Sequence, residues 1–344
     1  MNGFSSDATG ELAFAFGGPC VTGEIKQKAE DFRVDEIPGF EPDGQGDHVF
    51  LTIEKTGQTT NSVANRLRQF CGLQHRDIGY AGMKDKHAVT SQQFSLNLSG
   101  KAEPDWSGLE NDQLRILEIS RHPRKLKRGV LKGNRFRIVI RNLEGDKQQL
   151  ERRLQQIQRH GVPNYFGSQR FGYQGANIKQ ARRLFEHELK KIKRDERSIL
   201  LSSVRSMLFN AVLDERVKQD NWFRLLSGEV INLDGTERHF VEPVDEVLIK
   251  RAEELDVHPT GPLYGLPSRA LQPTDIAGEI EQNILAEYGF WRKGLEAFGL
   301  EHARRPLRVA VRDLQWSVSD KAMSVSFTLT SGAYATVVLR EFLA

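Results

Sequence analysis

One carboxylate lies between two lysines in a glycine-containing segment of the chain. In residues 79–96, Asp85 is flanked by Lys84 and Lys86, and Gly82 precedes all three. Neighbouring ammonium groups favour the ionised form of a carboxylic acid and lower its pKa, while glycine permits a sharp bend or a close approach to a ligand. Asp85 could therefore act as a nucleophile or as a general base, although the same residues are also typical of a solvated surface turn.

The spacing around this segment excludes two other kinds of site. No Gly-Lys-Ser or Gly-Lys-Thr follows the glycines, so the segment is not a phosphate-binding Walker loop. His87 adjoins the motif without a second histidine or acid at metal-ligand spacing. The remaining histidines, including His239 and His258, form no HxxxH pair, and the chain has no CxxC pair. We therefore predict no metal site and interpret His87 as structural.

Alternating and helical patterns predict the elements that position Asp85. Residues 48–55 alternate as a strand, and residues 59–61 supply caps for a helix over 62–70. Residues 78–81 and 92–98 are predicted as short strands on either side of Asp85. The carboxylate is thus expected in a loop at a strand end, where rigid elements commonly hold catalytic groups.

The rest of the chain mixes strands and helices in irregular order, which predicts an α+β fold. Further strands are predicted over 114–119, 135–140, 307–311 and 322–330, helices over 146–159 and 202–217, and a hairpin turning at Asp234-Gly235. The late strands need partners, and the first half of the chain supplies them. We therefore expect a discontinuous catalytic domain of residues 1–159 plus 309–344, and an inserted domain of residues 160–308.

Length and composition bound the class of protein. A chain of 344 residues is long enough for two domains that fold without disulfides. Cys20 and Cys71 are too few for a disulfide framework or a cysteine zinc site, so a reducing, cytoplasmic location is expected. The first 18 residues do not have the pattern of a signal peptide, and no apolar run reaches the length of a membrane span. We expect no membrane association.

A basic strip stands out against the formal net charge of +3. Residues 121–141 contain nine Lys or Arg residues and no acid. Such a strip attracts the phosphate backbone of a nucleic acid whatever its sequence. A solvated basic face remains the other interpretation.

The segment 79–92, GYAGMKDKHAVTSQ, resembles the signature of the TruD family of tRNA pseudouridine synthases, A-G-x-K-D-x-x-A-x-T-x-Q, whose aspartate is catalytic. Other segments resemble the same family in the same order along the chain: 23–36, 132–136, 161–172, 205–210 and 331–340. The resemblance implies a catalytic domain with a mixed, largely antiparallel sheet, interrupted by an inserted α+β domain. It also implies that the substrate is a uridine of tRNA, at position 13, which the enzyme converts to pseudouridine.

The resemblance assigns the catalytic role to Asp85. A cation is expected to hold this carboxylate ionised, and the family points to Lys26, with Lys84 as the local competitor. Breaking the glycosidic bond develops positive charge on the sugar, so an ionised carboxylate near C1′ can stabilise that charge, attack it or remove a proton. The sequence leaves open whether Asp85 is a nucleophile or a general base.

The same resemblance implies a pocket for a flipped uracil. Phe32 and Phe136 supply rings, and Asn134 offers a donor and an acceptor to the edge of the base. Tyr334 matches a position where the family carries phenylalanine, so its hydroxyl is a departure. Without the family, Phe32 would equally be a core residue and Asn134 a turn residue beside Gly133.

Lys84, Arg128 and Arg170 are candidate contacts to RNA outside that pocket. The segment 164–172, which contains Arg170, suits either RNA contact or a hinge between domains. Because the isomerisation gains and loses no atom, we expect no cofactor, and no protein partner is implied. The alternative function is a non-catalytic RNA-binding or RNA-chaperone module that uses the basic strip.

Overall fold

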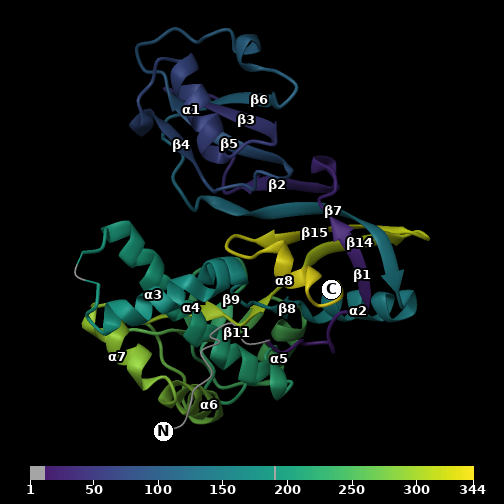
Figure 1. Ribbon diagram of the computed structural model, residues 1–344, viewed down its shortest axis with the longest axis vertical. Coiled ribbons are helices and arrows are strands. Elements are labelled where there is room, and N and C mark those ends of the chain that lie inside the picture. The colour runs from purple at the N-terminus through teal and green to yellow at the C-terminus, as the bar shows by residue number, and fades with distance from the viewer. Residues whose placement is uncertain (1–11, 190) are drawn as a thin grey trace. The chain divides into compact units, whose positions relative to one another are not determined.

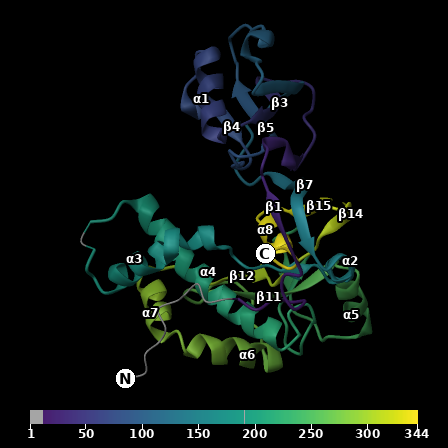
Figure 2. The ribbon, with the colours of Figure 1, turned by 45° about the vertical axis from the view of Figure 1, so that its right-hand side comes forward.

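The computed structural model describes residues 12–189 and 191–344, which form two compact units. The sheet unit comprises Cys20–Lys147, Val311–Ala335 and Leu343–Ala344. The helical unit comprises Gln148–Ala310, Thr336–Phe342 and the described residues up to Pro19. Both units combine helices with strands, which confirms the predicted α+β class (Figures 1 and 2). The division into a catalytic domain (1–159 plus 309–344) and an inserted domain (160–308) stays a prediction. Residues 1–11 of the predicted catalytic domain lie outside the described residues.

The sheet unit is built on one nine-stranded sheet. Its strands are β1 (Val21–Ile25), β2 (Phe32–Pro38), β3 (His48–Thr56), β4 (Ile78–Tyr80), β5 (Val89–Asn97), β6 (Leu114–His122), β7 (Leu131–Gly145), β14 (Arg312–Val318) and β15 (Ala322–Thr330). Their order is β14-β15-β7-β2-β5-β3-β6, with β1 beside β7 and β4 beside β5. Only the pair of β2 and β5 is parallel, so the predicted mixed, largely antiparallel sheet is confirmed.

Strand β7 joins the two ends of the chain in this sheet. It pairs with β15 from Gly133 opposite Thr330 to Arg141 opposite Ala322. A Cβ atom at Gly133 would lie 2.2 Å from the Leu329 carbonyl oxygen, so glycine alone lets the two strands approach here. The late strand therefore finds its partner in the first half of the chain, as its alternating pattern required.

Helix α1 (Thr60–Phe70) covers the sheet beside β3 and β5. Its first turn is capped by the Thr59 hydroxyl, which accepts from the Ser62 N–H at 3.0 Å. Val63 and Leu67 pack with Leu51 in the core of this part of the unit. Three short 3-10 helices complete the unit: Ala29–Asp31, His75–Asp77 and Trp106–Leu109.

The helical unit surrounds one long helix. Its helices are α2 (Lys147–His160), α3 (Ala176–Phe185), α4 (Arg194–Lys218), α5 (Glu246–Glu253), α6 (Asp275–Ala286), α7 (Gly289–Ala297) and α8 (Ala335–Leu339), with 3-10 turns at Ser168–Phe171 and Tyr173–Gly175. Helix α4 packs against α3, α6 and α7. Its residues Val204, Leu208 and Val212 are buried and lie on one face of the helix, so this face packs into the core.

Short strands of the helical unit form two small sheets. These strands are β8 (Val162–Pro163), β9 (Ile231–Leu233), β10 (His239–Phe240), β11 (Val257–Leu263), β12 (Ala303–Pro306) and β13 (Arg308–Val309). One sheet has the order β10-β9-β11-β12 and the other pairs β13 with β8. The β9–β10 hairpin turns at Gly235 with a φ of 69°, as predicted.

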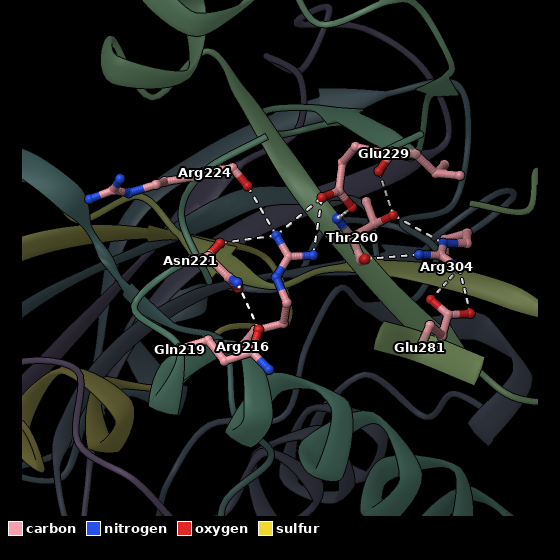
Figure 3. A network of polar contacts seen from close by, with 9 residues as sticks. Arg216, Gln219, Asn221, Arg224, Glu229, Thr260, Glu281 and Arg304 are labelled. Carbon is pink, nitrogen blue, oxygen red and sulfur yellow. Dashed lines mark hydrogen bonds and ion pairs between the residues drawn. The ribbon is translucent and has the colours of Figure 1, made fainter. Parts of the chain in front are cut away.

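Two buried ion pairs join the elements of this unit (Figure 3). Arg304 donates to both Glu281 carboxylate oxygens at 3.0 and 2.9 Å, and to the Thr260 hydroxyl and carbonyl oxygens at 3.0 and 2.8 Å. Arg216 donates twice to Glu229 at 3.1 Å, and Glu229 accepts from the Thr260 N–H at 3.4 Å. Thr260 of β11 therefore links the two pairs, which connect α4, β12 and α6.

Candidate active site

Asp85 lies in the loop between β4 and β5 and is paired with Lys26. The ammonium of Lys26, the first residue after β1, donates to Asp85 Oδ2. The other oxygen, Oδ1, accepts a long hydrogen bond of 3.3 Å from the His87 N–H. The Asp85 side chain is 42% exposed, so a ligand can reach the carboxylate while the pair is formed.

The surroundings keep Asp85 ionised. Burial raises the pKa of its carboxyl, but the hydrogen bond and the charge of Lys26 lower it, and so do the backbone N–H groups of His87 and Lys86. The net pKa lies below the usual value for aspartate. The carboxylate thus carries its negative charge at neutral pH.

Lys55 fixes the backbone of this loop through hydrogen bonds to carbonyl oxygens. Its side chain is fully buried, and its ammonium donates to the Gln58 carbonyl at 2.6 Å and to the Asp85 carbonyl at 2.9 Å. Burial lowers the pKa of Lys55 to about 8, although the charge of Asp85 opposes this shift. Sequence reasoning missed Lys55. The spacing of Lys55 in β3 could have revealed it, because Lys55 follows Leu51 and Ile53 at every second position and so lies on the same buried face of the strand.

A second set of hydrogen bonds fixes the start of the loop. The buried Thr60 hydroxyl accepts from the Lys84 N–H at 2.9 Å and donates to Gln92 Oε1 at 2.8 Å. Gln92 Nε2 in turn donates to the Gly82 carbonyl at 3.1 Å. The loop is therefore attached to α1, β3 and β5 before any substrate binds, which is the preorganisation that a catalytic group requires.

Lys84 does not contact the Asp85 carboxylate. Its ammonium instead lies 2.7 Å from Glu36 Oε2 and donates to Asn134 Oδ1 at 2.8 Å. The Lys84 and Glu36 side chains are only 5% and 2% exposed. Of the two candidate cations, Lys26 is the one that pairs with Asp85, and Lys84 orients Asn134.

Phe32 and Phe136 pack beside the pair. The Lys26 ammonium lies 4.3 Å from the centre of the Phe32 ring, and this ring contacts Phe136 edge to face at 6.4 Å. The two residues are 6% and 7% exposed, so each ring offers little more than an edge to a ligand. Their visible role in the structure is to fix the position of Lys26.

Tyr334 offers an open aromatic surface in the same unit. It follows β15, whose Leu329 lies opposite Asn134, and the Ser331 N–H donates to the Lys132 carbonyl at 3.1 Å. Tyr334 is 47% exposed. The segment that carries it is therefore tied to the strand that carries Asn134.

The remaining candidates lie in different places. Arg128 donates to the Tyr80 hydroxyl at 3.0 Å and covers that ring. With Lys125 and Asn61, it lines a cavity of about 570 Å³. Arg170 belongs to the helical unit, where it donates to Ser202 at 3.2 Å. The structure thus brings together Asp85, Lys26, Phe32 and Phe136, and separately Lys84 with Asn134.

The basic strip of residues 121–141 is less charged in the folded chain than in the sequence. Arg137 pairs with Asp35 at 2.5 Å, Arg141 with Asp31 at 2.7 Å, and Arg121 with Glu103. These three acids are remote in sequence, so a local count of charges could not find them. In the described part of the chain, no group of three or more His, Cys, Asp or Glu residues could hold a metal ion. No helix in residues 12–189 or 191–344 has the length and apolar character needed to cross a membrane.

Comparison with known proteins identifies the family. The family model described as tRNA pseudouridine synthase D (TruD) matches residues 8–181 and 176–342. The tRNA pseudouridine synthase D of Methylococcus capsulatus (strain ATCC 33009 / NCIMB 11132 / Bath) is 47% identical over 333 residues, covering 96% of this chain and 94% of that protein. The protein of the same name from Nitrosococcus oceani is 44% identical over 343 residues, covering 98% and 95%.

A solved structure shares the fold. The crystal structure of TruD from Methanosarcina mazei superposes with a TM-score of 0.72, at 20% identity, over 97% of this chain and 96% of that chain. The identity with the curated relatives extends over nearly the whole length of each protein. The chain therefore belongs to the TruD family of tRNA pseudouridine synthases.

Proposed function

We propose that this chain converts a uridine of tRNA, at position 13, to pseudouridine, with Asp85 as the catalytic carboxylate. One observation carries the assignment of the residue: an ionised, solvent-accessible carboxylate is paired with Lys26 while its loop is fixed from below by Lys55. Family membership supports the reaction and the class of substrate.

The reaction requires a charged group in the enzyme and does not require an added oxidant or reductant. The bond between C1′ and N1 of the uridine breaks, the uracil turns, and a bond forms between C1′ and C5. The proton on C5 is released to solvent, and N1 carries a proton in the product, so atoms and electrons balance without an oxidant or reductant. Positive charge develops on the ribose when the first bond breaks, and a preorganised carboxylate stabilises it.

We assign Asp85 Oδ1 as the oxygen that acts on the ribose. Lys26 occupies Oδ2, while Oδ1 accepts a long hydrogen bond of 3.3 Å from the His87 N–H. Lys26 therefore keeps the carboxylate ionised and directs its less engaged oxygen toward the substrate. This arrangement serves attack at C1′ and removal of a proton at C2′ equally well.

Recognition of uracil is proposed for Asn134 and Tyr334. Because Lys84 donates to Asn134 Oδ1, the orientation of the amide is set and its Nδ2 group can donate to a carbonyl of the base. The exposed ring of Tyr334 can stack on a uracil that has left the RNA helix, which contributes about 1–3 kcal/mol. Phe32 and Phe136 would close the pocket with their edges.

The basic strip gives a non-catalytic RNA-binding module less support in the folded chain than in the sequence. Its surface would be the basic strip, where Asp31, Asp35 and Glu103 neutralise three of the arginines. Such a module would also have no use for the preorganised pair of Lys26 and Asp85. The small number of cysteines, Cys20 and Cys71, together with a tRNA substrate, supports the proposal of a cytoplasmic enzyme.

Tritium release tests the proposal directly. Purified protein without added cofactor should release tritium from tRNA transcripts labelled at C5 of uridine, and mapping of the product should place pseudouridine at position 13. Asp85→Asn should lower kcat by at least about 10³-fold, because the amide can neither balance the developing charge nor accept a proton. Asp112→Asn, an exposed acid of the same unit, is the matched control. Full activity in Asp85→Asn would refute the assignment of this residue.

A further inference from the structure

A second cationic site lies in the helical unit. A pocket of about 670 Å³ is lined by five arginines: Arg170, Arg194, Arg197, Arg205 and Arg305. None of the described residues that line it is Asp or Glu. We call it the arginine pocket. Its walls come from α4, the 3-10 turn at Ser168–Phe171, β12 and the segment after α7.

One face of α4 forms much of the wall. Arg194, Arg197, Leu201 and Arg205 recur at intervals of three or four residues, which places them on the same side of a helix. Helix α4 lies beside α3 and α7, and Figure 1 shows these three helices together. The arginines at the two ends of this row are separated by roughly 16 Å along the helix axis, at about 1.5 Å per residue.

Four of the five arginines in the pocket have no carboxylate partner in the part of the chain that the structure describes. Among the described residues, Arg170, Arg194, Arg197 and Arg205 form no ion pair with a carboxylate. Arg205 donates only to backbone carbonyls, those of Leu263 at 2.7 Å and Glu301 at 3.0 Å. Burial lowers the pKa of the Arg205 guanidinium, and no carboxylate opposes the shift. Unbalanced guanidinium groups of this kind favour an anionic ligand.

Aromatic packing preorganises two of the arginines. The guanidinium of Arg305 lies 4.3 Å from the centre of the Phe166 ring, and that of Arg170 lies 5.2 Å from it. Ser202 accepts from Arg170 at 3.2 Å. A guanidinium held against a ring loses little freedom when it binds a phosphate through two hydrogen bonds. The pocket is therefore a built anion site rather than a scatter of surface charges.

We propose that the arginine pocket binds consecutive phosphate groups of the tRNA substrate. The proposal rests on the proposed function for the identity of the ligand, since family membership makes tRNA the polyanion at hand. A row of about 16 Å is longer than one phosphate group and suits a short stretch of backbone. The pocket supplies affinity and register for the tRNA, while the chemistry stays with Asp85 in the other unit.

Removing the two exposed arginines of the row tests the proposal. The Arg194→Ala/Arg197→Ala variant is compared with Arg152→Ala/Arg159→Ala, which removes the same charge from exposed positions of α2 outside the pocket. Binding of unmodified tRNA transcript to the full chain is measured over a series of KCl concentrations. The pocket variant should weaken binding at least fivefold. It should also reduce the slope of log K against log salt by about 0.7–0.9 for each phosphate group that the variant no longer neutralises.

Further measurements separate the possible outcomes. Arg194→Lys/Arg197→Lys, which keeps the charge, should recover most of the salt slope. Wild-type affinity and slope in the alanine variant, or an equal loss of affinity in the α2 control, would overturn the proposal. So would an effect on the binding of inorganic phosphate without an effect on tRNA. Binding is measured without turnover, so it does not depend on catalysis. A wild-type protein that releases no tritium would refute the proposed function, and the binding measurements would still show whether the arginine pocket binds tRNA.

Discussion

Two ion pairs, one in each unit of this protein, differ in burial and in how fully their atoms are engaged. In the helical unit, Arg304 directs its donors to Glu281 and Thr260, and both side chains of the ion pair are buried. In the sheet unit, Lys26 occupies one oxygen of Asp85, and the carboxylate remains open to solvent with its second oxygen weakly engaged. In the first pair every nitrogen of the Arg304 guanidinium donates a hydrogen bond, whereas in the second pair one oxygen of Asp85 is only weakly hydrogen-bonded.

The difference separates a structural role from a chemical one. A buried pair whose hydrogen bonds are satisfied fixes the elements that carry it, and its partners are expensive to remove singly. An exposed pair contributes little to stability, typically about 0–1 kcal/mol, but it leaves a charged oxygen available for a substrate. Substitutions in the two pairs should therefore separate stability from activity.

Removing the charge of Glu281 should give the largest loss of stability. Glu281→Gln leaves the Arg304 guanidinium buried without a carboxylate, so we expect the free energy of unfolding to fall by about 3–5 kcal/mol. Urea denaturation followed by circular dichroism measures the loss, and activity per folded molecule should be retained. Glu279→Gln, at an exposed position of α6, is the control. Equal stability of the two variants would show that the buried pair does not stabilise the unit.

Lys84 tests the boundary between the two roles, because it is buried in an ion pair and also orients a candidate substrate-binding residue. Lys84→Met leaves the Glu36 carboxylate buried, and we expect the free energy of unfolding to fall by about 2–3 kcal/mol, since Glu36 still accepts from the Gln93 N–H. Both Lys84→Met and Glu36→Gln/Lys84→Met should have a lowered kcat/KM, because Asn134 has lost the donor that orients it. The double variant should recover stability, because it no longer buries an unpaired carboxylate. Lys86→Met, an exposed neighbour, should change neither quantity.

Lys26→Met should show the reverse behaviour, with unfolding free energy within about 1 kcal/mol of wild type and a clear loss of activity. Without the ammonium, burial still raises the pKa of Asp85, and of the groups that lower it the backbone N–H groups of His87 and Lys86 remain. We expect kcat/KM to fall about tenfold at pH 7.5 and about a hundredfold at pH 5. A pH profile parallel to that of the wild type would show that Lys26 does not control the ionisation of Asp85.

The smallest effect is expected in the wild type itself. Because the pKa of Asp85 lies below its usual value in the folded chain, the stabilising contribution of its charge is present above the unfolded pKa of about 3.9 and is lost only as the pH falls through the lower folded value. Single-turnover rates between pH 5 and pH 7 should therefore vary less than about twofold on account of Asp85. An acid limb with a midpoint near pH 6 would contradict this.

The sequence could predict what depends on local pattern. The strand over 322–330 has the predicted bounds, and the cap at Thr59 and the turn at Gly235 lie where turn and cap residues placed them. The position of Asp85 in a loop between two strands could likewise be predicted, from the alternating residues of the strands and the glycine between them.

Contacts between distant segments could not be predicted in this way. Lys26 and Lys84 were both candidate partners of Asp85, and only the fold decides between them, since Glu36 captures Lys84 across the sheet. The same holds for Arg137 and Arg141, whose acidic partners come from β2 and the turn before it. The arginine pocket assembles residues from 166 to 305, so no window of sequence displays it.

The pairing of β7 with β15 has a consequence for synthesis of the chain. One edge of β7 has no partner until residues 322–330 have been translated, after nearly the whole helical unit. At roughly 5–20 residues per second, that interval is on the order of ten seconds or more. An open strand edge pairs readily with other chains. On the ribosome, the nascent chain therefore presents a defined aggregation-prone edge for a chaperone to cover, and a circular permutant beginning near β14 would remove the delay.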